Sequence, residues 1–531
     1  MKHLIRPTAV LILYIIFALY LIDLIMGVDV INPTNTTWMF EGGDWSQHQL
    51  GWEFFRNSDW SFPLTAIDGF FYPIGANIGY TDSIPLLAFF FKLFDPILPA
   101  EFQYFGPLIF INFTLQGLFA YRIARNFSFS FLSSILWGLL LMLTPPLIHR
   151  LGHTALTTHW LFLYVWYQYQ IKATAPRTFI PVLISLLIHP YLTVMIIISK
   201  LFDWLRLPPI KLIRNITIAG ILSLSIWWML GYFSTPGDQL FGDVGYYDTF
   251  ILGFIFGPPE MTTILDRFLT YPVLRSDAAS EGSAYLGLGI ISATFITLSS
   301  LRKPNHQKRI PYYILSYSFL LLSIAIFASR LGQIKYRLAE FPLMTSLMSS
   351  FRTNGRFLWI IWYFIVFFTI KYFPRTKLTL PLLLLFFGMQ YLDIEPLLDF
   401  SMRPEARIYS QEIYSTIEKT LPLSSTQTIA IYPPYRREIH FVEDYVLFSL
   451  VAARNKKNIT AGYLARHDKT KAAQVENQYL SDLYTSTLDP NTVYVSSRHF
   501  DKPLLHAYDQ NPDKTSGICF GSYRAITPVT P

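Results

Sequence analysis

The chain has 531 residues, of which 52% are hydrophobic, 17% are aromatic and only 15% are charged. Soluble domains carry about 25% charged residues, and apolar runs of about 20 residues match the thickness of a bilayer core. The composition therefore excludes an ordinary soluble protein and predicts an α-helical polytopic membrane protein. The single cysteine, Cys519, excludes an intramolecular disulfide.

Apolar runs define the predicted membrane spans. The first run, 8–26, is too long for a signal peptide and lacks a small-residue cleavage site, so we expect it to remain as a span. Residues 178–202 are interrupted by His189-Pro190-Tyr191 and form either one kinked span or a hairpin of two short helices. The other predicted spans are 104–121, 131–147, 155–171, 216–233, 284–301, 311–328, 356–370 and 378–394.

The distribution of charge favours the hairpin. With a hairpin at 178–202, the loops on the side of the amino terminus are basic and contain one acid, Asp203. This positive-inside pattern predicts about eleven membrane segments and a cytoplasmic amino terminus. A single span would place the basic loop 302–309 outside. The basic residues that produce the net charge of +7 are thus distributed according to the predicted membrane topology. The net charge therefore gives no indication of nucleic-acid binding.

The predicted topology divides the chain into a membrane domain, 1–395, and an extracytoplasmic domain, 396–531. The first outer loop, 27–103, contains an apolar segment, 83–98, that is broken by charged residues and a proline. We expect this segment to form a helix lying in the outer interface rather than a span. The other long outer loops are 234–283 and 329–355.

The tail after residue 396 has ordinary polarity and balanced charge. Short β-rich runs alternate with helical patterns, which predicts a small α/β domain. The predicted strands are 428–432, 492–496 and 517–522, and the predicted helices are 441–454 and 469–485.

Asp44 is the first candidate for chemistry, with Glu41 three residues before it in a polar, aromatic-rich outer loop. A loop carboxylate can take a proton from a hydroxyl, or hold a sugar hydroxyl or a metal. A solvated acid or a helix N-cap is the alternative. The nearby tryptophans and phenylalanines suit either sugar stacking or an interfacial aromatic belt.

Basic residues form the second and third candidates. His149, Arg150 and His153 close the span 131–147, where an arginine and two histidines can bind a phosphate or simply extend to the interface. The i,i+4 spacing of the histidines is also compatible with a metal. Arg352 and Arg356, four residues apart, are expected to share one helix face and clamp a phosphate or pyrophosphate, unless they only contact headgroups.

Three further residues are weaker candidates. Glu281 precedes a span as either a second acidic group or a helix-start acid, and His189 precedes a proline that by itself explains a turn. Asp82 lies in the first outer loop. The chain contains no P-loop, G-x-S-x-G, HExxH or Rossmann signature, so ATP hydrolysis, serine-hydrolase chemistry and zincin chemistry have no support.

The sequence resembles the C-type (GT-C) superfamily of multi-spanning glycosyltransferases and, within it, an uncharacterised bacterial membrane-protein family of similar length. The matching segments are GGDWSQHQLGWEFFRNSDWSFP (42–63), YTDSIPLLAFFFKLF (80–94), FQYFGP (102–107), HRLGHTALTTHW (149–160), HPYL (189–192), EGSAYLGLG (281–289) and SSFRTNGRFLW (349–359).

The resemblance implies an enzyme of the bacterial cytoplasmic (inner) membrane that uses a polyprenyl-phosphate-linked sugar as co-substrate. It implies inverting transfer to a glycan or lipid acceptor on the outer side, with Asp44 matching the acidic residue that assists the acceptor. Arg352 and Arg356, with His149, Arg150 or His153, are expected to stabilise charge on the lipid phosphate. Glu281, Asp82 and His189 are weaker substrate-binding candidates. Glu41 and Asp44 do not form the clean acidic pair seen in some members, so a divalent cation lacks support and no other cofactor is expected.

Two other classes of function remain open from the sequence. A transporter or flippase of a lipid-linked glycan also carries intramembrane charges and a broken hairpin. A non-catalytic membrane scaffold would use its tail to bind a partner. The sequence shows no inverted repeat, which disfavours the transporter.

Overall fold

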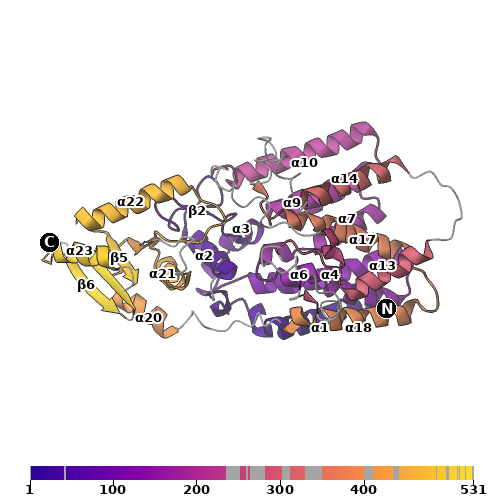
Figure 1. Cartoon of the computed structure of the whole chain (residues 1–531), viewed down its shortest axis with the longest axis horizontal. Coiled ribbons are helices and arrows are strands. Elements are labelled where there is room, and N and C mark those ends of the chain that lie inside the picture. Colours follow the sequence, from indigo (N-terminus) through magenta and orange to yellow (C-terminus); the bar gives the residue numbers. More distant parts are fainter. Residues whose placement is uncertain are drawn as a thin grey trace. The chain divides into compact units, whose positions relative to one another are not determined.

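The computed structural model describes residues 2–40, 43–234, 251–258, 261–262, 281–301, 311–328, 350–399, 411–433, 442–485, 487–497, 501–510, 512–513, 515–520 and 522–528. These residues are mostly helical, and the chain divides into two compact units (Figure 1). Unit 1 comprises Met1–Asn32, Phe105–Leu224 and Gly237–Arg403, and unit 2 comprises Pro33–Tyr104, Ser225–Pro236 and Pro404–Pro531.

Four described segments are long and apolar enough to cross a membrane: Pro7–Ile25, Phe131–His149, Pro209–Met229 and Asn354–Tyr372. They correspond to α1 (Lys2–Ile25), α5 (Phe131–Met142) with α6 (Pro145–His149), α10 (Pro209–Met229), and η10 (Asn354–Phe357) with α17 (Leu358–Tyr372). Far fewer than the eleven predicted segments therefore meet the length and composition of a span among the described residues.

The other predicted segments are shorter or more polar helices. Those of 10–17 residues include α13 (Leu288–Ser300), α14 (Tyr312–Ala328) and α18 (Thr379–Asp393). The segment predicted at 155–171 shortens to α7 (Trp160–Gln170), because Thr154–Thr157 forms a 3-10 turn, η4. The segment 104–121 becomes α4 (Phe105–Asn126), whose last turns carry arginines.

The segment 178–202 is divided at the predicted interruption. Helix α8 (Ile180–Leu186) ends before His189, and α9 (Pro190–Trp204) begins at the proline, which is favoured at the first position of a helix. The two helices pack against each other.

Helix α13 begins against α18 through a cap supplied from another helix. The Asp393 carboxylate accepts hydrogen bonds from the Leu288 N–H (2.9 Å) and from the Tyr285 hydroxyl (2.6 Å). The Gln390 amide oxygen accepts from the N–H groups of Gly289 (3.0 Å) and Ile290 (3.2 Å). Asp393 and Gln390 are fully buried, so they satisfy the orphan donors of a helix start that water does not reach.

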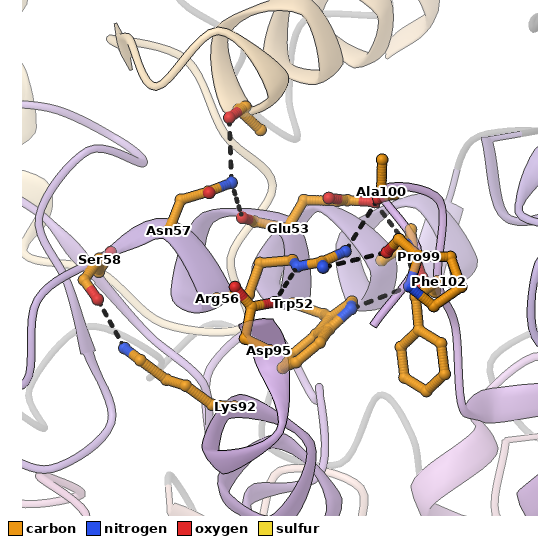
Figure 2. A network of polar contacts seen from close by, with 12 residues as sticks. Trp52, Glu53, Arg56, Asn57, Ser58, Lys92, Asp95, Pro99, Ala100 and Phe102 are labelled. Carbon is orange, nitrogen blue, oxygen red and sulfur yellow. Dashed lines mark hydrogen bonds and ion pairs between the residues drawn. The ribbon is translucent and has the colours of Figure 1, made fainter. Parts of the chain in front are cut away.

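In unit 2, α2 (Gly43–Asn57) is fixed by polar contacts along its length, and Figure 2 shows the network at its carboxyl end. Arg56 pairs with Asp95 at 2.7 Å and also donates to the carbonyls of Pro99 and Ala100. The Trp52 indole donates to the Phe102 carbonyl at 3.1 Å. These bonds attach α2 to the segment that follows α3 (Pro85–Leu93).

Helix α3 occupies part of the segment for which an interfacial helix is predicted. Its length of 9 residues is too short for a span. Phe90 and Leu93 are exposed, and so are Phe94 and Ile97 directly after the helix. This segment of unit 2 therefore presents large apolar side chains at its surface.

The tail contains a five-stranded sheet of order β4-β3-β5-β7-β6. Strands β4 (Asn458–Ile459), β3 (Thr428–Tyr432) and β5 (Thr492–Ser497) are parallel, and β7 (Tyr523–Pro528) and β6 (Thr515–Phe520) continue it antiparallel. Side chains of α22 (Lys469–Thr485) and α23 (Lys502–Gln510) share a core with β3, β5 and β7. Helices α20 (Gln411–Thr420) and α21 (Val442–Arg454) also pack on the sheet (Figure 1), so the predicted α/β character of the tail is confirmed.

The close contact of α13 with α18 gives a first prediction. A Cβ at Gly289 would overlap the backbone carbonyl of Phe386, so Gly289→Ala is expected to destabilise unit 1 by about 1–3 kcal/mol through overpacking. Gly388→Ala, on α18, meets no atom within 4 Å and serves as the matched control. Thermal melting of the detergent-solubilised protein measures both, and equal melting temperatures would contradict the packing described.

Candidate functional site

One carboxylate joins two arginines from distant parts of unit 1. Glu281 Oε2 accepts from Arg150 Nη1 at 2.5 Å and from Arg356 Nη2 at 2.7 Å. The arginine side chains are 9% and 6% exposed, whereas the Glu281 side chain is 33% exposed. We call Glu281, Arg150 and Arg356 the charge cluster, which is buried on the arginine side and open on the carboxylate side.

Arg150 takes its position from the end of a candidate span. Pro145 and Pro146 interrupt the helix after α5, and the short α6 then ends at His149. Arg150 Nη2 lies 2.6 Å from His149 Nδ1. Because a guanidinium only donates, His149 Nδ1 accepts, and the ring is neutral with its proton on Nε2.

Arg356 reaches Glu281 because two glycines allow their backbones to pack closely. A Cβ at Gly282 would meet Gly355 Cα, so neither segment tolerates a side chain at Gly282 without moving. The indoles of Trp359 and Trp362 then donate to the carbonyls of Ser283 (2.9 Å) and Tyr285 (3.0 Å). The segment after Glu281 is thereby held along the first turns of α17.

Tyr191 connects this region to the start of α9. Its hydroxyl accepts from the Thr353 N–H at 2.9 Å, and the Arg356 guanidinium lies 5.2 Å from its ring centre. His189 caps α9, with Nδ1 accepting from the Tyr191 N–H at 3.1 Å. The ring of His153 lies 6.3 Å from that of His189, centre to centre. Three segments that the sequence analysis singled out, 149–153, 189–191 and 350–357, thus lie together beside the charge cluster.

The charge cluster brings two guanidiniums to one carboxylate. Burial alone would raise the pKa of the Glu281 carboxyl, but Arg150 and Arg356, with help from His153, hold its pKa well below the usual value of 4.5. Glu281 is therefore ionised at neutral pH and pairs with both guanidiniums. Guanidiniums at a half-open site of this kind can bind an anionic group.

A second group of candidates lies in unit 2. Asp44 is in the first turn of α2, and His48 follows one turn later, so the two share a helix face. His48 is fully buried and Asp82 is 8% exposed. A His48 ring nitrogen and an Asp82 carboxylate oxygen lie within 4.8 Å of each other. An imidazole and a carboxylate within this limit can be bridged by a water molecule or by a shared cation.

The structure corrects three expectations about these residues. Asp44 lies in the first turn of a helix rather than in a loop. At this position the helix dipole stabilises a negative charge. Arg352 precedes η10 while Arg356 belongs to it, so the two do not share a helix face. His149 and His153 do not lie on one helical turn, because α6 ends at His149. Glu41 lies outside the described residues.

Two residues of these groups were missed in the sequence. His48 is four residues after Asp44, a spacing that becomes informative only once the segment is known to be helical. Tyr191 follows the proline of the hairpin, and its position between Arg356 and the Thr353 N–H depends on segments far away in the chain.

The comparisons with known proteins identify a family without assigning an activity. Residues 15–395 match a family model described as a domain of unknown function (DUF6311), and residues 421–518 match its companion, the DUF6311 C-terminal domain. No curated protein matches the chain.

The charge cluster generates a second prediction. Glu281→Gln removes the counter-charge of two buried guanidiniums and is expected to cost about 1–3 kcal/mol of stability. Asp399→Asn, which replaces an exposed acid of unit 1, should change stability by less than about 0.5 kcal/mol. Melting curves at pH 7 compare the two variants, and a Glu281→Gln protein as stable as the wild type would contradict the assigned role.

A third prediction concerns pH. A carboxyl whose pKa is lowered in the folded state stabilises the protein above its unfolded-state pKa, and this stabilisation disappears as the pH falls toward the folded-state value. The difference in melting temperature between wild type and Glu281→Gln should therefore be constant near neutrality and shrink progressively below pH 4.5. A difference that grows on acidification would show that Glu281 is not held ionised by the arginines.

Proposed function

The chain belongs to the DUF6311 family, and we propose that it is an integral-membrane glycosyltransferase. It moves a sugar from a polyprenyl-phosphate carrier to a glycan or lipid acceptor on the outer side of the bacterial cytoplasmic membrane. The observation that carries the proposal is the charge cluster, in which two buried guanidiniums meet at a partly exposed carboxylate at the ends of two candidate spans. The resemblance to the C-type superfamily supplies the reaction class.

The charge cluster fits the phosphate of the donor. A polyprenyl-phosphate sugar is a phosphodiester with one negative charge, which guanidinium groups can bind. Each guanidinium has five N–H donors in a fixed fork, a geometry that matches the oxygens of a phosphate. When the sugar leaves, the lipid phosphate gains a second negative charge, and fixed guanidiniums stabilise that charge without reorganisation.

Asp44 is the proposed general base. Its carboxylate takes the proton of an acceptor hydroxyl, the oxygen attacks the anomeric carbon, and the carbon–oxygen bond to the lipid phosphate breaks with inversion. The proposal assigns His48, on the same face of α2, and Asp82 to relay or orient that proton, and their proximity supports this role. A divalent cation would have ligands in the same pair, but the mechanism does not require one.

The proposed topology has a cytoplasmic amino terminus, about eleven membrane segments and an extracytoplasmic tail. The basic loops support the orientation. Support for an interfacial α3 comes from its exposed Phe90 and Leu93, which an aqueous loop would not favour.

Replacement of Asp44 tests this function. Mass spectrometry of surface glycans and lipids should show a loss of one sugar in cells without the gene and in cells carrying Asp44→Asn. In membranes, the rate of sugar transfer should fall by at least about 100-fold, because a general base contributes about 10²–10⁴-fold. Asp59→Asn, an exposed acid of the same unit, is the control and should retain transfer.

The outcomes separate the function classes. Undiminished transfer by Asp44→Asn would refute the assigned base. Loss of a complete glycan together with accumulation of its lipid-linked form inside the cell would instead indicate a transporter.

A further inference from the structure

Basic side chains and a tyrosine come together in unit 1 at the far end of α17 from the charge cluster. Helix α9 packs against α7, α14 and α17 (Figure 1). Tyr169 lies in the last turn of α7, Arg206 follows α9, and Lys371 lies in the last turn of α17. Arg356 precedes α17, so the 15 residues of this helix separate it from Lys371 by about 22 Å. We call Tyr169, Arg206 and Lys371 the basic patch.

Buried ion pairs hold the Arg206 guanidinium in place. Lys200, whose side chain is fully buried, donates to Asp203 Oδ2 and to the Gln168 amide oxygen, both at 3.2 Å. Asp203 Oδ1 accepts from Arg206 Nη2 at 2.5 Å, and the guanidinium carbon lies 4.2 Å from the centre of the Tyr169 ring. Among the described residues, Asp203 is the only hydrogen-bond partner of the Arg206 side chain. The guanidinium is therefore preorganised while most of its N–H donors remain available.

The half-buried Lys371 adds a second cation at Tyr169. The Tyr169 hydroxyl lies within electrostatic range of Lys371, of Arg206 and of one carboxylate, that of Asp203. Asp203 already pairs with Lys200 and Arg206, whereas Lys371 forms no ion pair with a described residue. Asp203 is also the single acid in the basic loops of the predicted topology. The basic patch therefore favours an anionic ligand.

An apolar stripe on α14 begins beside the basic patch. The Tyr312 hydroxyl donates to the Leu205 carbonyl at 2.9 Å, so α14 starts next to Arg206. Large exposed side chains then follow every three or four residues on one face of α14, namely Tyr312, Leu315, Phe319 and Leu322. At about 1.5 Å per residue the stripe extends about 15 Å, which is half of the hydrocarbon core of a bilayer. This length matches the depth of one leaflet.

We propose that the basic patch binds the phosphate of an anionic glycerophospholipid, with an acyl chain along the apolar stripe of α14. Arg206 and Lys371 donate to the phosphate oxygens, and the fork of the guanidinium matches two of them. Basic pockets between membrane helices recognise anionic head groups in this way. A free phosphate would meet the same cations but would leave the stripe unused. Because the basic patch shares no residue with the charge cluster, the inference does not depend on the transfer reaction.

Binding of short-chain lipids to the full-length protein in a neutral detergent tests the site. The probes, followed by isothermal titration calorimetry, are dioctanoyl-phosphatidylglycerol, dioctanoyl-phosphatidylcholine and inorganic phosphate. The wild type should bind the phosphatidylglycerol saturably and at least about tenfold more tightly than either of the other two. Lys371→Gln and Arg206→Gln should each weaken this binding by about fivefold or more, because each removes one cation that faces the phosphate.

Lys377→Gln is the matched control. Lys377 is an exposed lysine of the loop after α17 and is not among the charges that act on Tyr169. Its replacement removes the same charge from the same region, and it should leave the affinity within about twofold of the wild type because exposed charges at a distance are screened. Melting curves should show that the two patch variants are folded, since Asp203 keeps Lys200 as its partner in Arg206→Gln.

Each of the other outcomes overturns the proposal. Equal binding of phosphatidylglycerol and phosphatidylcholine, or saturable binding of neither, would show that the protein does not select an anionic lipid. Inorganic phosphate that binds as tightly as the lipid would reveal a site for free anions. Equal losses in Lys371→Gln and Lys377→Gln would indicate a diffuse surface potential. Unchanged binding in both patch variants would place the lipid elsewhere, for example at the charge cluster.

Discussion

The ion pairs of Glu281 are the interaction on which unit 1, with its apolar helices, depends. Two guanidiniums that are almost fully buried beside apolar helices would cost several kcal/mol without a counter-charge. Glu281 supplies that counter-charge to both arginines from the open end of the site, where its side chain is 33% exposed. The glycine contact at Gly282 and Gly355 and the tryptophan hydrogen bonds of α17 serve this arrangement, since they bring the carboxylate within reach of Arg356.

The same constraint explains the start of α13. A helix that begins inside the protein has N–H groups that water does not satisfy, and unit 1 supplies the acceptors from Asp393 and Gln390 of α18. The segment between Glu281 and Leu288 is therefore fixed at both ends by buried polar contacts. This explains why the motif 281–289 is rich in glycine: Gly282, Gly287 and Gly289 all face atoms that leave no room for a side chain.

Local sequence patterns predict the type and position of several elements of this chain. They do not predict the length of every helix or the contacts between distant segments. Strand 428–432 and helix 469–485 agree with the structure to the residue, because alternation and helical periodicity are local signals. The sequence did not predict that α7 begins only at Trp160. Residues Thr154–Thr157 are apolar enough to continue a helix, yet they form a 3-10 turn. The pairing of Glu281 with Arg150 joins residues separated by 131 positions, and a single sequence contains no signal for such a contact.

The segments that form unit 2 determine which of the proposed sites belongs to which unit. Residues 33–104 fall within the larger family match, yet they form one compact unit with the tail, which has its own family model. The backbone bonds between Tyr72, Gly69 and Ile459 make the loop part of the sheet edge, so the tail is not an appendage that can be removed independently. The proposed base therefore belongs to unit 2, while the proposed phosphate site belongs to unit 1. Each group is held by contacts within its own unit, and such preorganisation is what a reaction limited by positioning and charge stabilisation requires.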